Sequence, residues 1–236
     1  MAAGIEKYLL VPYAADRAPA DEVDYWEKHV ERNAGTPASR LRLGLAYSKA
    51  GQLEEAEKSF AAALALEPDY DAAAIGSYGV VVRQGGRARA IEALDRYARA
   101  HPDCSVCWQN LAVEYLSQKK LRAAEAAVEF LLVSDFSVDA KMYGVRDMEV
   151  EASILAGRVA AARGDRRRAI EFFRAAILRD PSDLRGYILQ AKNLLAGDDP
   201  GSALAILEQA RARSEGDTRS QHEIERLIRL ARQVQR

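Results

Sequence analysis

The 236-residue sequence contains few of the residues that build metal centres, disulfide frameworks or membrane spans. It has 2 Cys, 3 His and 3 Met, and its longest stretch without a charged side chain, residues 72–82, is eleven residues long. Two cysteines are too few for the disulfide framework of a small secreted domain, and a bilayer span needs roughly 20 apolar residues. The 34 basic side chains nearly balance the 35 acidic ones, so no overall charge attracts nucleic acid or an anionic membrane. The sequence therefore predicts no membrane span and no nucleic-acid partner.

Catalytic and targeting motifs are missing as well. The sequence has no glycine-rich phosphate loop, no GxSxG or HExxH motif and no histidine paired with a carboxylate at short range. The N-terminal residues MAAGIEKYLLVPY lack the basic and apolar sections of a signal peptide. We therefore expect a non-enzymatic protein without a cofactor. Its expected location is the cytoplasm, or the periplasm if a leader has been removed.

Alanine, by contrast, is abundant, and its spacing reveals an internal repeat. The chain contains 44 Ala. From Pro37 onward it divides into blocks of 34 residues, at 37–70, 71–104, 105–138, 150–183 and 184–217, with an insert at 139–149. One column of these blocks is occupied by Ala56, Ala90, Ala124, Ala169 and Ala203. Chance would produce this column at a frequency on the order of 10⁻⁴ in so alanine-rich a chain, so the period is a structural signal.

Other columns indicate that each block is a pair of antiparallel helices. A large residue follows each of those alanines by four positions, which places both on one helix face. These residues are Phe60, Leu94, Val128, Phe173 and Leu207. Gly51, Gly85 and Gly164 lie midway through their blocks, where one helix must end and the chain reverse. Proline at 68, 102 and 181 closes three blocks where the second helix stops.

The first block carries the most complete pattern, and it resembles the tetratricopeptide repeat. The matching residues are Leu43, Gly44, Tyr47, Ala56, Phe60, Ala63 and Pro68. The resemblance extends, with weaker matches, over residues 37–217. It implies an all-α fold, a right-handed superhelical solenoid of helix-turn-helix repeats, whose concave groove is lined by the first helix of each pair.

The two ends are expected to cover this stack. Residues 1–36 contain an apolar segment, a linker and a helix over 21–33. Residues 218–236 are predicted to form a capping helix with an apolar stripe on one side. The stripe consists of Ile224, Leu227, Ile228, Ala231 and Val234. The arginines of that helix (Arg226, Arg229, Arg232 and Arg236) are interpreted as a solvated outer face.

The resemblance also implies which residues line the groove. They are Leu41, Leu45, Ser48, Ile75, Gly79, Val82, Gln109, Val113, Leu116, Ile154, Arg158, Ile188 and Lys192. The first three blocks contribute an apolar strip and the last two add positive charge. We expect a scaffold or adaptor that binds a protein partner, as an amphipathic helix or an extended peptide with apolar anchors and an acidic end. The alternative is that these apolar residues are the edge of the packing between repeats.

Two irregular segments suggest a second hypothesis, a structural or assembly subunit. The apolar residues between Ile5 and Tyr13 could fill the groove of their own chain or of a second copy, which would make a homo-oligomer. The insert contains Met142, Tyr143 and Met148, which either form a secondary contact surface or extend the next helix. This platform, loosely similar to pilotins, would act through its ends and the insert.

The segment HPDCSVC places His101, Cys104 and Cys107 within seven residues. Three such ligands could hold a metal, but a structural zinc site needs four, and the other two histidines lie in the end helices. A disulfide between cysteines three apart would close a very short loop and constrain little. The preferred interpretation is that these small residues fill a tight turn between repeats, and no metal is expected.

Overall fold

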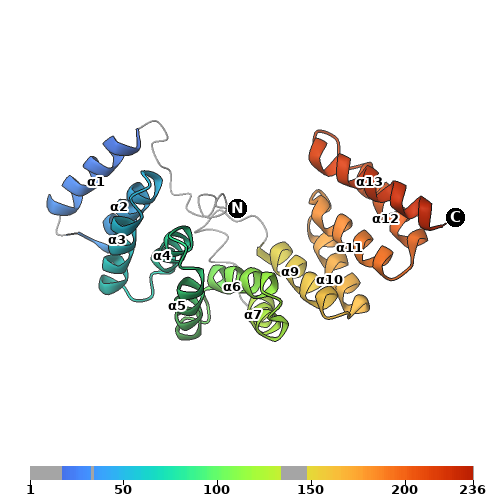
Figure 1. Ribbon diagram of the computed structural model, residues 1–236, viewed down its shortest axis with the longest axis horizontal. Coiled ribbons are helices and arrows are strands. Elements are labelled where there is room, and N and C mark those ends of the chain that lie inside the picture. Colours follow the sequence, from blue (N-terminus) through green and yellow to red (C-terminus); the bar gives the residue numbers. More distant parts are fainter. Residues whose placement is uncertain (1–17, 33–34, 134–147, 236) are drawn as a thin grey trace. The chain divides into compact units, whose positions relative to one another are not determined.

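The computed structural model describes residues 18–32, 35–133 and 148–235, and over these ranges the chain forms helices joined by short turns (Figure 1). The described residues form twelve α-helices and no strand, which confirms the predicted all-α class. No helix in the described ranges combines the length and the apolarity needed to cross a bilayer. Residues 5–13, Met142 and Tyr143 lie outside the described ranges, so the hypotheses that depend on them stay predictions.

The helices belong to two compact units, which are described separately. Unit 1 comprises Met1–Leu111 and Ser137–Val145, and unit 2 comprises Ala112–Phe136 and Arg146–Arg236. Unit 1 contains α1 (Pro19–Arg32), α2 (Pro37–Lys49), α3 (Leu53–Leu66), α4 (Asp71–Arg83), α5 (Arg87–Ala100) and the first half of α6 (Ser105–Ser117). Unit 2 contains the rest of α6, α7 (Leu121–Val133), α9 (Met148–Ala162), α10 (Arg166–Arg179), α11 (Leu184–Ala196), α12 (Pro200–Arg211) and α13 (Thr218–Val234).

Short polar side chains start many of these helices. Asp165, Asp183, Asp199 and Asp217 each precede a helix of unit 2, and a side-chain oxygen of each accepts a hydrogen bond from a backbone N–H in the first turn. These bonds satisfy backbone donors that have no partner within the helix. In unit 1, Thr36 caps α2 in the same way. These caps fix where α2, α10, α11, α12 and α13 begin, whereas α3, α4 and α5 start without a side-chain cap.

The alanine column lies on the buried face of the second helices. Each of its five members is the fourth residue of a second helix, and each is between 0% and 1% exposed. The large residues four positions later are buried as well. Phe60 is fully buried, and a Cβ added to Gly44 of α2 or Gly76 of α4 would lie 2.7 or 2.6 Å from its ring. Glycine at these two positions lets both helices pack directly on the phenyl ring.

All five turns within the helix pairs use one residue with positive φ. Gly51, Gly85 and Gly164 adopt φ values of 79°, 86° and 84°. The equivalent residues of the other two pairs are Lys119 (φ 57°) and Asp198 (φ 60°). A side chain beyond Cβ is therefore tolerated at this position, although glycine adopts the left-handed conformation at lower cost.

The end helices pack as covers on their units. In unit 1, α1 contacts α2, where the Tyr47 hydroxyl donates to Glu27 and Lys49 Nζ pairs with the buried Glu22 at 3.0 Å. Burial and the Glu27 carboxylate raise the pKa of Tyr47. In unit 2, α13 packs on α11 and α12 and buries four of its five predicted apolar residues. The exception is Val234, the last residue of the helix, which is 48% exposed.

The helix after the insert begins earlier than the repeat period predicts. α9 starts at Met148, two residues before the expected block boundary, so the end of the insert extends this helix. Met148 is 1% exposed and therefore packs inside its own unit. The prediction that Met148 belongs to a contact surface is wrong, because a side chain at this depth is not available to a partner.

Candidate functional site

The face formed by the first helices differs between the two units. In unit 1, four of the predicted groove residues (Leu41, Ile75, Gly79 and Gln109) are buried, and three (Leu45, Ser48 and Val82) are partly exposed. The Ser48 hydroxyl and carbonyl both accept hydrogen bonds from Arg83 Nη1, at 2.7 and 3.0 Å. Unit 1 thus offers a small apolar surface around Leu45 and Val82.

In unit 2 the same register position carries exposed side chains on successive helices. Val113, Arg158 and Lys192 occupy the ninth position of their blocks, and all three are exposed. Ile188, one turn before Lys192 on α11, is partly exposed, as is Leu116. Ile154 is 4% exposed and packs with Val150 and Ala176, so it belongs to the core of the unit. First helices contact each other directly, α9 with α11 and α11 with α13, which makes this face continuous.

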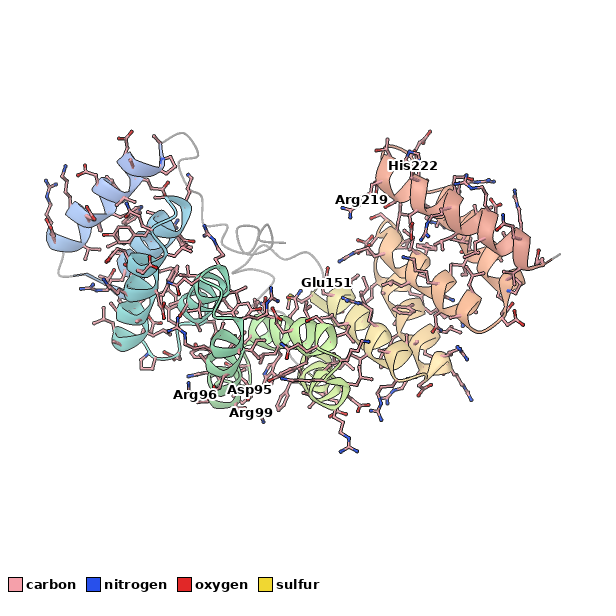
Figure 2. All side chains as sticks on the ribbon, viewed as in Figure 1. Asp95, Arg96, Arg99, Glu151, Arg219 and His222 are labelled. Atoms are coloured by element: carbon pink, nitrogen blue, oxygen red, sulfur yellow. A yellow bond between two sulfur atoms is a disulfide. The ribbon has the colours of Figure 1, made fainter. Side chains whose placement is uncertain are left out.

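Sequence reasoning missed further basic residues of this face. If the 34-residue register is continued into α13, Arg226 falls in the column of Arg158 and Lys192, and Arg219 falls in the column of Glu151 and Arg185. Both arginines are exposed. Figure 2 shows Glu151 on α9 and Arg219 on α13. The interpretation of Arg226 as part of a solvated outer face is therefore incomplete, and the repeat period could have identified its column.

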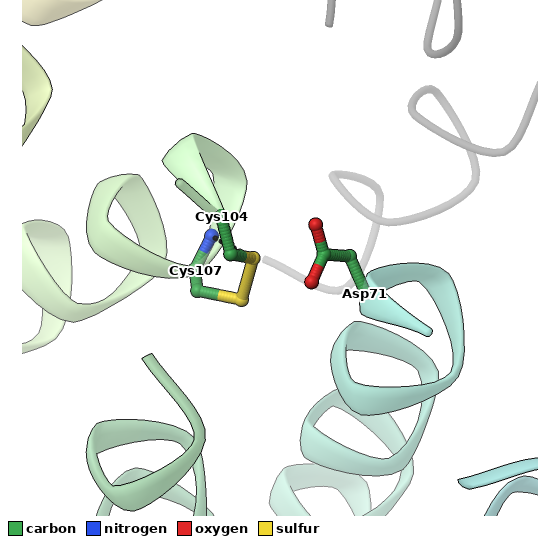
Figure 3. A group of neighbouring side chains, drawn as sticks. All are labelled: Asp71, Cys104 and Cys107. Carbon is green, nitrogen blue, oxygen red and sulfur yellow. Dashed lines mark hydrogen bonds between the residues drawn. A yellow bond between two sulfur atoms is a disulfide. The ribbon is translucent and has the colours of Figure 1, made fainter. Parts of the chain in front are cut away.

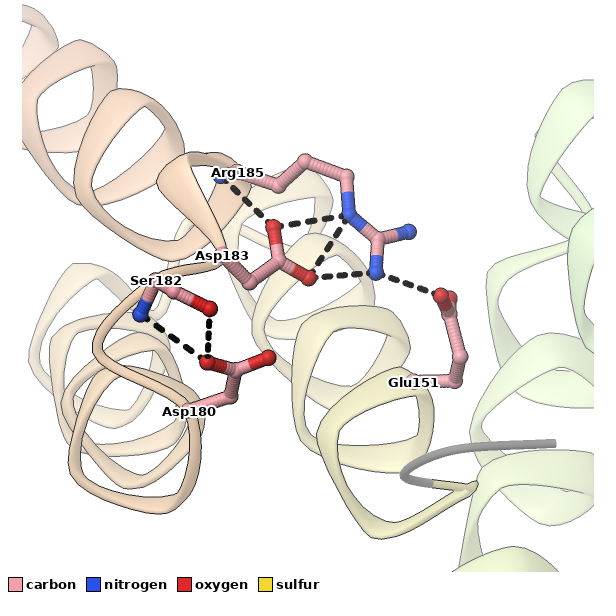
Figure 4. Close-up of polar contacts among 5 residues, drawn as sticks. All are labelled: Glu151, Asp180, Ser182, Asp183 and Arg185. Carbon is pink, nitrogen blue, oxygen red and sulfur yellow. Dashed lines mark hydrogen bonds and ion pairs between the residues drawn. The ribbon is translucent and has the colours of Figure 1, made fainter. Parts of the chain in front are cut away.

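Arg185 links two helices and the cap of α11 (Figure 4). Its guanidinium pairs with Asp183, which caps α11, and with Glu151 of α9, each through Nη2 at 2.5 Å. The Asp183 hydrogen bonds and the Glu151 carboxylate raise the pKa of Arg185. In the preceding turn, two hydrogen bonds from Ser182 lower the pKa of Asp180. This network fixes α9 against α11 at the start of the first-helix face.

Glu223 joins two of the basic residues into a second cluster. Its carboxylate accepts hydrogen bonds from Arg226 Nε at 2.9 Å and Nη2 at 2.8 Å, and it pairs with Lys192 Nζ at 2.8 Å. The Arg226 hydrogen bonds, followed by Lys192, lower the pKa of Glu223 from 4.5 to about 2. Glu223 therefore stays ionised and holds both cations on one face.

The low pKa of Glu223 makes its contribution to stability dependent on pH. Because the folded pKa lies below the unfolded one, the contribution is present above pH 4.5 and is lost as the pH falls through about 2. The difference in unfolding free energy between wild type and Glu223→Gln is expected to be largest above pH 4.5 and to shrink toward pH 2. Urea unfolding followed by circular dichroism at several pH values measures it. Glu225→Gln is the control, because Arg211 lies 3.8 Å from that carboxylate, and a constant difference for Glu223→Gln would contradict the prediction.

Unit 1 contains a cavity of about 280 Å³ between α3, α4 and α5. It is lined mainly by Leu64, Tyr78, Val81, Leu94 and Tyr97. None of the predicted groove residues lines it. The cavity is thus a feature of the packing between helix pairs, separate from the first-helix face.

The structure brings together only part of the predicted cysteine and histidine group. Cys104 and Cys107 form a disulfide and are 1% and 0% exposed. His101 instead stacks on Tyr97, with 4.4 Å between the ring centroids. The third group beside the sulfur atoms is the carboxylate of Asp71, which is not among the predicted ligands (Figure 3). Asp71 starts the preceding first helix, about one repeat earlier, so no local sequence motif links it to the cysteines.

Comparisons with known proteins agree with this architecture. The model of the tetratricopeptide repeat family matches residues 37–70. The crystal structure of YrrB, described as a TPR protein with an unusual peptide-binding site, is 16% identical with a TM-score of 0.59 and covers 86% of this chain and 99% of its own. A TPR protein from Cytophaga hutchinsonii is 13% identical with a TM-score of 0.68, and the match covers 92% of this chain and 84% of that one.

A third similar structure is MamA from Desulfovibrio magneticus RS-1. It is 14% identical with a TM-score of 0.59, and the match covers 85% of this chain and 99% of that one. A comparison with curated protein sequences finds no match. The resemblance seen in the first block is thus confirmed: residues 37–70 match the tetratricopeptide repeat, and the chain has the fold of tetratricopeptide-repeat solenoids.

Proposed function

We propose that the protein is a non-enzymatic scaffold or adaptor, and that unit 2 binds an acidic peptide segment of a protein partner along its first-helix face. The observation that carries this proposal is the exposed basic column Arg158, Lys192 and Arg226, on three successive first helices. A second column adds Arg185 and Arg219. Basic groups repeated on successive helices favour an extended anionic segment over a single small anion.

Part of the basic charge on this face has no carboxylate partner within it. Arg185 is paired with Glu151 and Asp183, and Lys192 and Arg226 share Glu223. Arg219 is exposed near Asp217, which lies in the column of Asp183. Arg158 is exposed and has no ion-pair partner among the described residues. An acidic segment would therefore gain electrostatic attraction on this face.

The same face supplies an apolar contact. Ile188 lies between Arg185 and Lys192 on α11, at spacings of three and four residues that place all three on one side of the helix. Its side chain is partly exposed. A partner with one apolar side chain flanked by carboxylates matches this order of groups. The peptide-binding site named for YrrB supports the same class of function, at the level of fold similarity.

A peptide titration tests the proposal directly. A fluorescein-labelled peptide with one leucine flanked by aspartates is compared with the same peptide carrying lysines instead, by fluorescence anisotropy at low salt. We expect the aspartate peptide to bind at least about tenfold more tightly, and Arg158→Glu to weaken it about tenfold, because a lost attraction becomes a repulsion.

The matched control is Arg174→Glu, an exposed arginine on α10, the second helix of the same pair. This variant should leave the affinity unchanged. Absence of binding, equal binding of the two peptides, or equal effects of the two variants would each contradict the proposal. The platform hypothesis depends on the ends of the chain and the insert 139–149, of which residues 1–17 and 139–147 lie outside the described ranges, and its oligomeric state stays a separate prediction.

A further inference from the structure

We propose that Asp71, Cys104 and Cys107 bind a zinc ion when the two cysteines are reduced, and that oxidation to the disulfide releases the metal. The three residues stand at the starts of two successive first helices. Asp71 is the first residue of α4, Cys104 directly precedes α6, and Cys107 is the third residue of α6. Their sulfur and carboxylate oxygen atoms all lie within 4.8 Å of one another, and Figure 3 shows the carboxylate beside the disulfide.

The surrounding structure holds these side chains in place. The Tyr97 hydroxyl of α5 donates a hydrogen bond to Asp71 Oδ1 at 2.8 Å. The indole N–H of Trp108 donates to the Pro102 carbonyl at 3.0 Å, which fixes the turn that carries the cysteines. The cysteines themselves are buried, and Asp71 is partly buried. The positions of the three ligands are therefore set by the fold of unit 1.

The donor set suits zinc. Zinc binds thiolate sulfur at about 2.3 Å and carboxylate oxygen at about 2.0–2.2 Å, so the ligand atoms of a tetrahedral site lie roughly 3.3–3.8 Å apart. The two sulfur atoms and the carboxylate oxygen lie within 4.8 Å of one another, so small side-chain rotations in the reduced protein bring them to the separations of a zinc site. Soft thiolates select zinc over magnesium or calcium. With three protein ligands, the fourth position is left to a water molecule.

The charge of the ligands changes with the redox state. Zinc binding to the reduced protein releases the protons of both cysteines and forms two thiolates, and the bound Zn²⁺ compensates these two charges and that of Asp71. In the disulfide state the two sulfur atoms carry no charge and are poor ligands, so Asp71 is the one charged ligand that remains. The same three residues thus bind zinc strongly in one redox state only.

The release step balances with a small-molecule disulfide, such as oxidised glutathione, as the oxidant. The sulfur atoms of Cys104 and Cys107 lose one electron each and form the protein S–S bond. The S–S bond of the oxidant breaks and takes up these two electrons as two thiolates. The zinc ion leaves as Zn²⁺, because both thiolate ligands have been consumed.

Cobalt titration of the full chain tests this site, since thiolate-to-cobalt charge-transfer absorption reports sulfur ligation. The reduced protein is expected to bind one Co²⁺ with this absorption and to lose it when one equivalent of Zn²⁺ is added. The oxidised protein should show no such absorption. Asp71→Asn should weaken Co²⁺ binding by about tenfold or more, and Cys107→Ser should abolish the absorption.

His101→Gln is the control, because His101 stacks on Tyr97 and is not one of the three converging ligands. Its Co²⁺ affinity should equal that of the wild type. Circular dichroism verifies that each variant folds. If Cys107→Ser does not fold, Asp71→Asn still tests the site, because asparagine has nearly the same shape as aspartate. A reduced wild type without the absorption, or an Asp71→Asn affinity equal to the wild type, would overturn the proposal.

Discussion

Replacing Phe60 by alanine is expected to lower the free energy of unfolding by about 3–5 kcal/mol, the usual cost of removing a fully buried phenyl ring. Phe60 is 0% exposed and lies in the core of unit 1 with Leu41, Ala63 and Val80. Its ring is packed against both α2 and α4, as the positions of Gly44 and Gly76 show. The truncation would leave a cavity between two helix pairs that neighbouring alanines cannot fill.

The matched control is Leu66→Ala on the same helix, whose side chain is 52% exposed and should change stability by less than about 0.5 kcal/mol. Urea unfolding of the full chain gives the overall change. Because repeat arrays can unfold in parts, hydrogen exchange of α2, α3 and α4 locates it. Equal losses for the two variants would show that the ring is not the centre of this core.

Replacing Gly76 by alanine is expected to destabilise the protein by about 1–3 kcal/mol, even though alanine is the better helix former. The added Cβ would lie 2.6 Å from Phe60 Cε1, too close for the ring to remain in place. In a Phe60→Leu background the same substitution should cost much less, because the smaller side chain leaves room for the methyl group. The double-mutant cycle measures this coupling.

Gly201→Ala is the control for this second prediction. An added Cβ there has its nearest neighbour, Gln235 Nε2, at an ordinary contact distance of 3.5 Å. Helix propensity then dominates, and the variant should be as stable as the wild type or up to about 1 kcal/mol more stable. Equal effects of Gly76→Ala in both Phe60 backgrounds would show that the ring does not determine the cost.

The helix pairs were predictable because each is specified by local pattern. The alanine column and the large residue four positions later predict one buried face, and both columns are buried throughout. The turns at Lys119 and Asp198 were harder to predict, because the sequence does not indicate a positive φ at a residue other than glycine. The division into two units was not predicted either, since the repeat period continues through α6, where the units meet in sequence.

The candidate sites depend on distances that span a whole repeat or more. The proximity of Asp71 to Cys104 follows from the equivalent positions of α4 and α6, which becomes visible only when both helices are placed. The 34-residue blocks end at residue 217, so the sequence predicts only a cap around Arg226. Arg226 pairs with Glu223, which also pairs with Lys192, and this shared carboxylate extends the basic column into α13.

The contacts between helices that are neighbours in sequence also influence the folding rate. Within each unit, helices adjacent in sequence pack together, so few long loops must close before buried surface is gained. Chains with such local topology search few alternatives and fold in roughly microseconds to milliseconds. Growth can begin at any helix pair and spread to its neighbours. A nascent chain could therefore order its first pairs while later ones are still being synthesised.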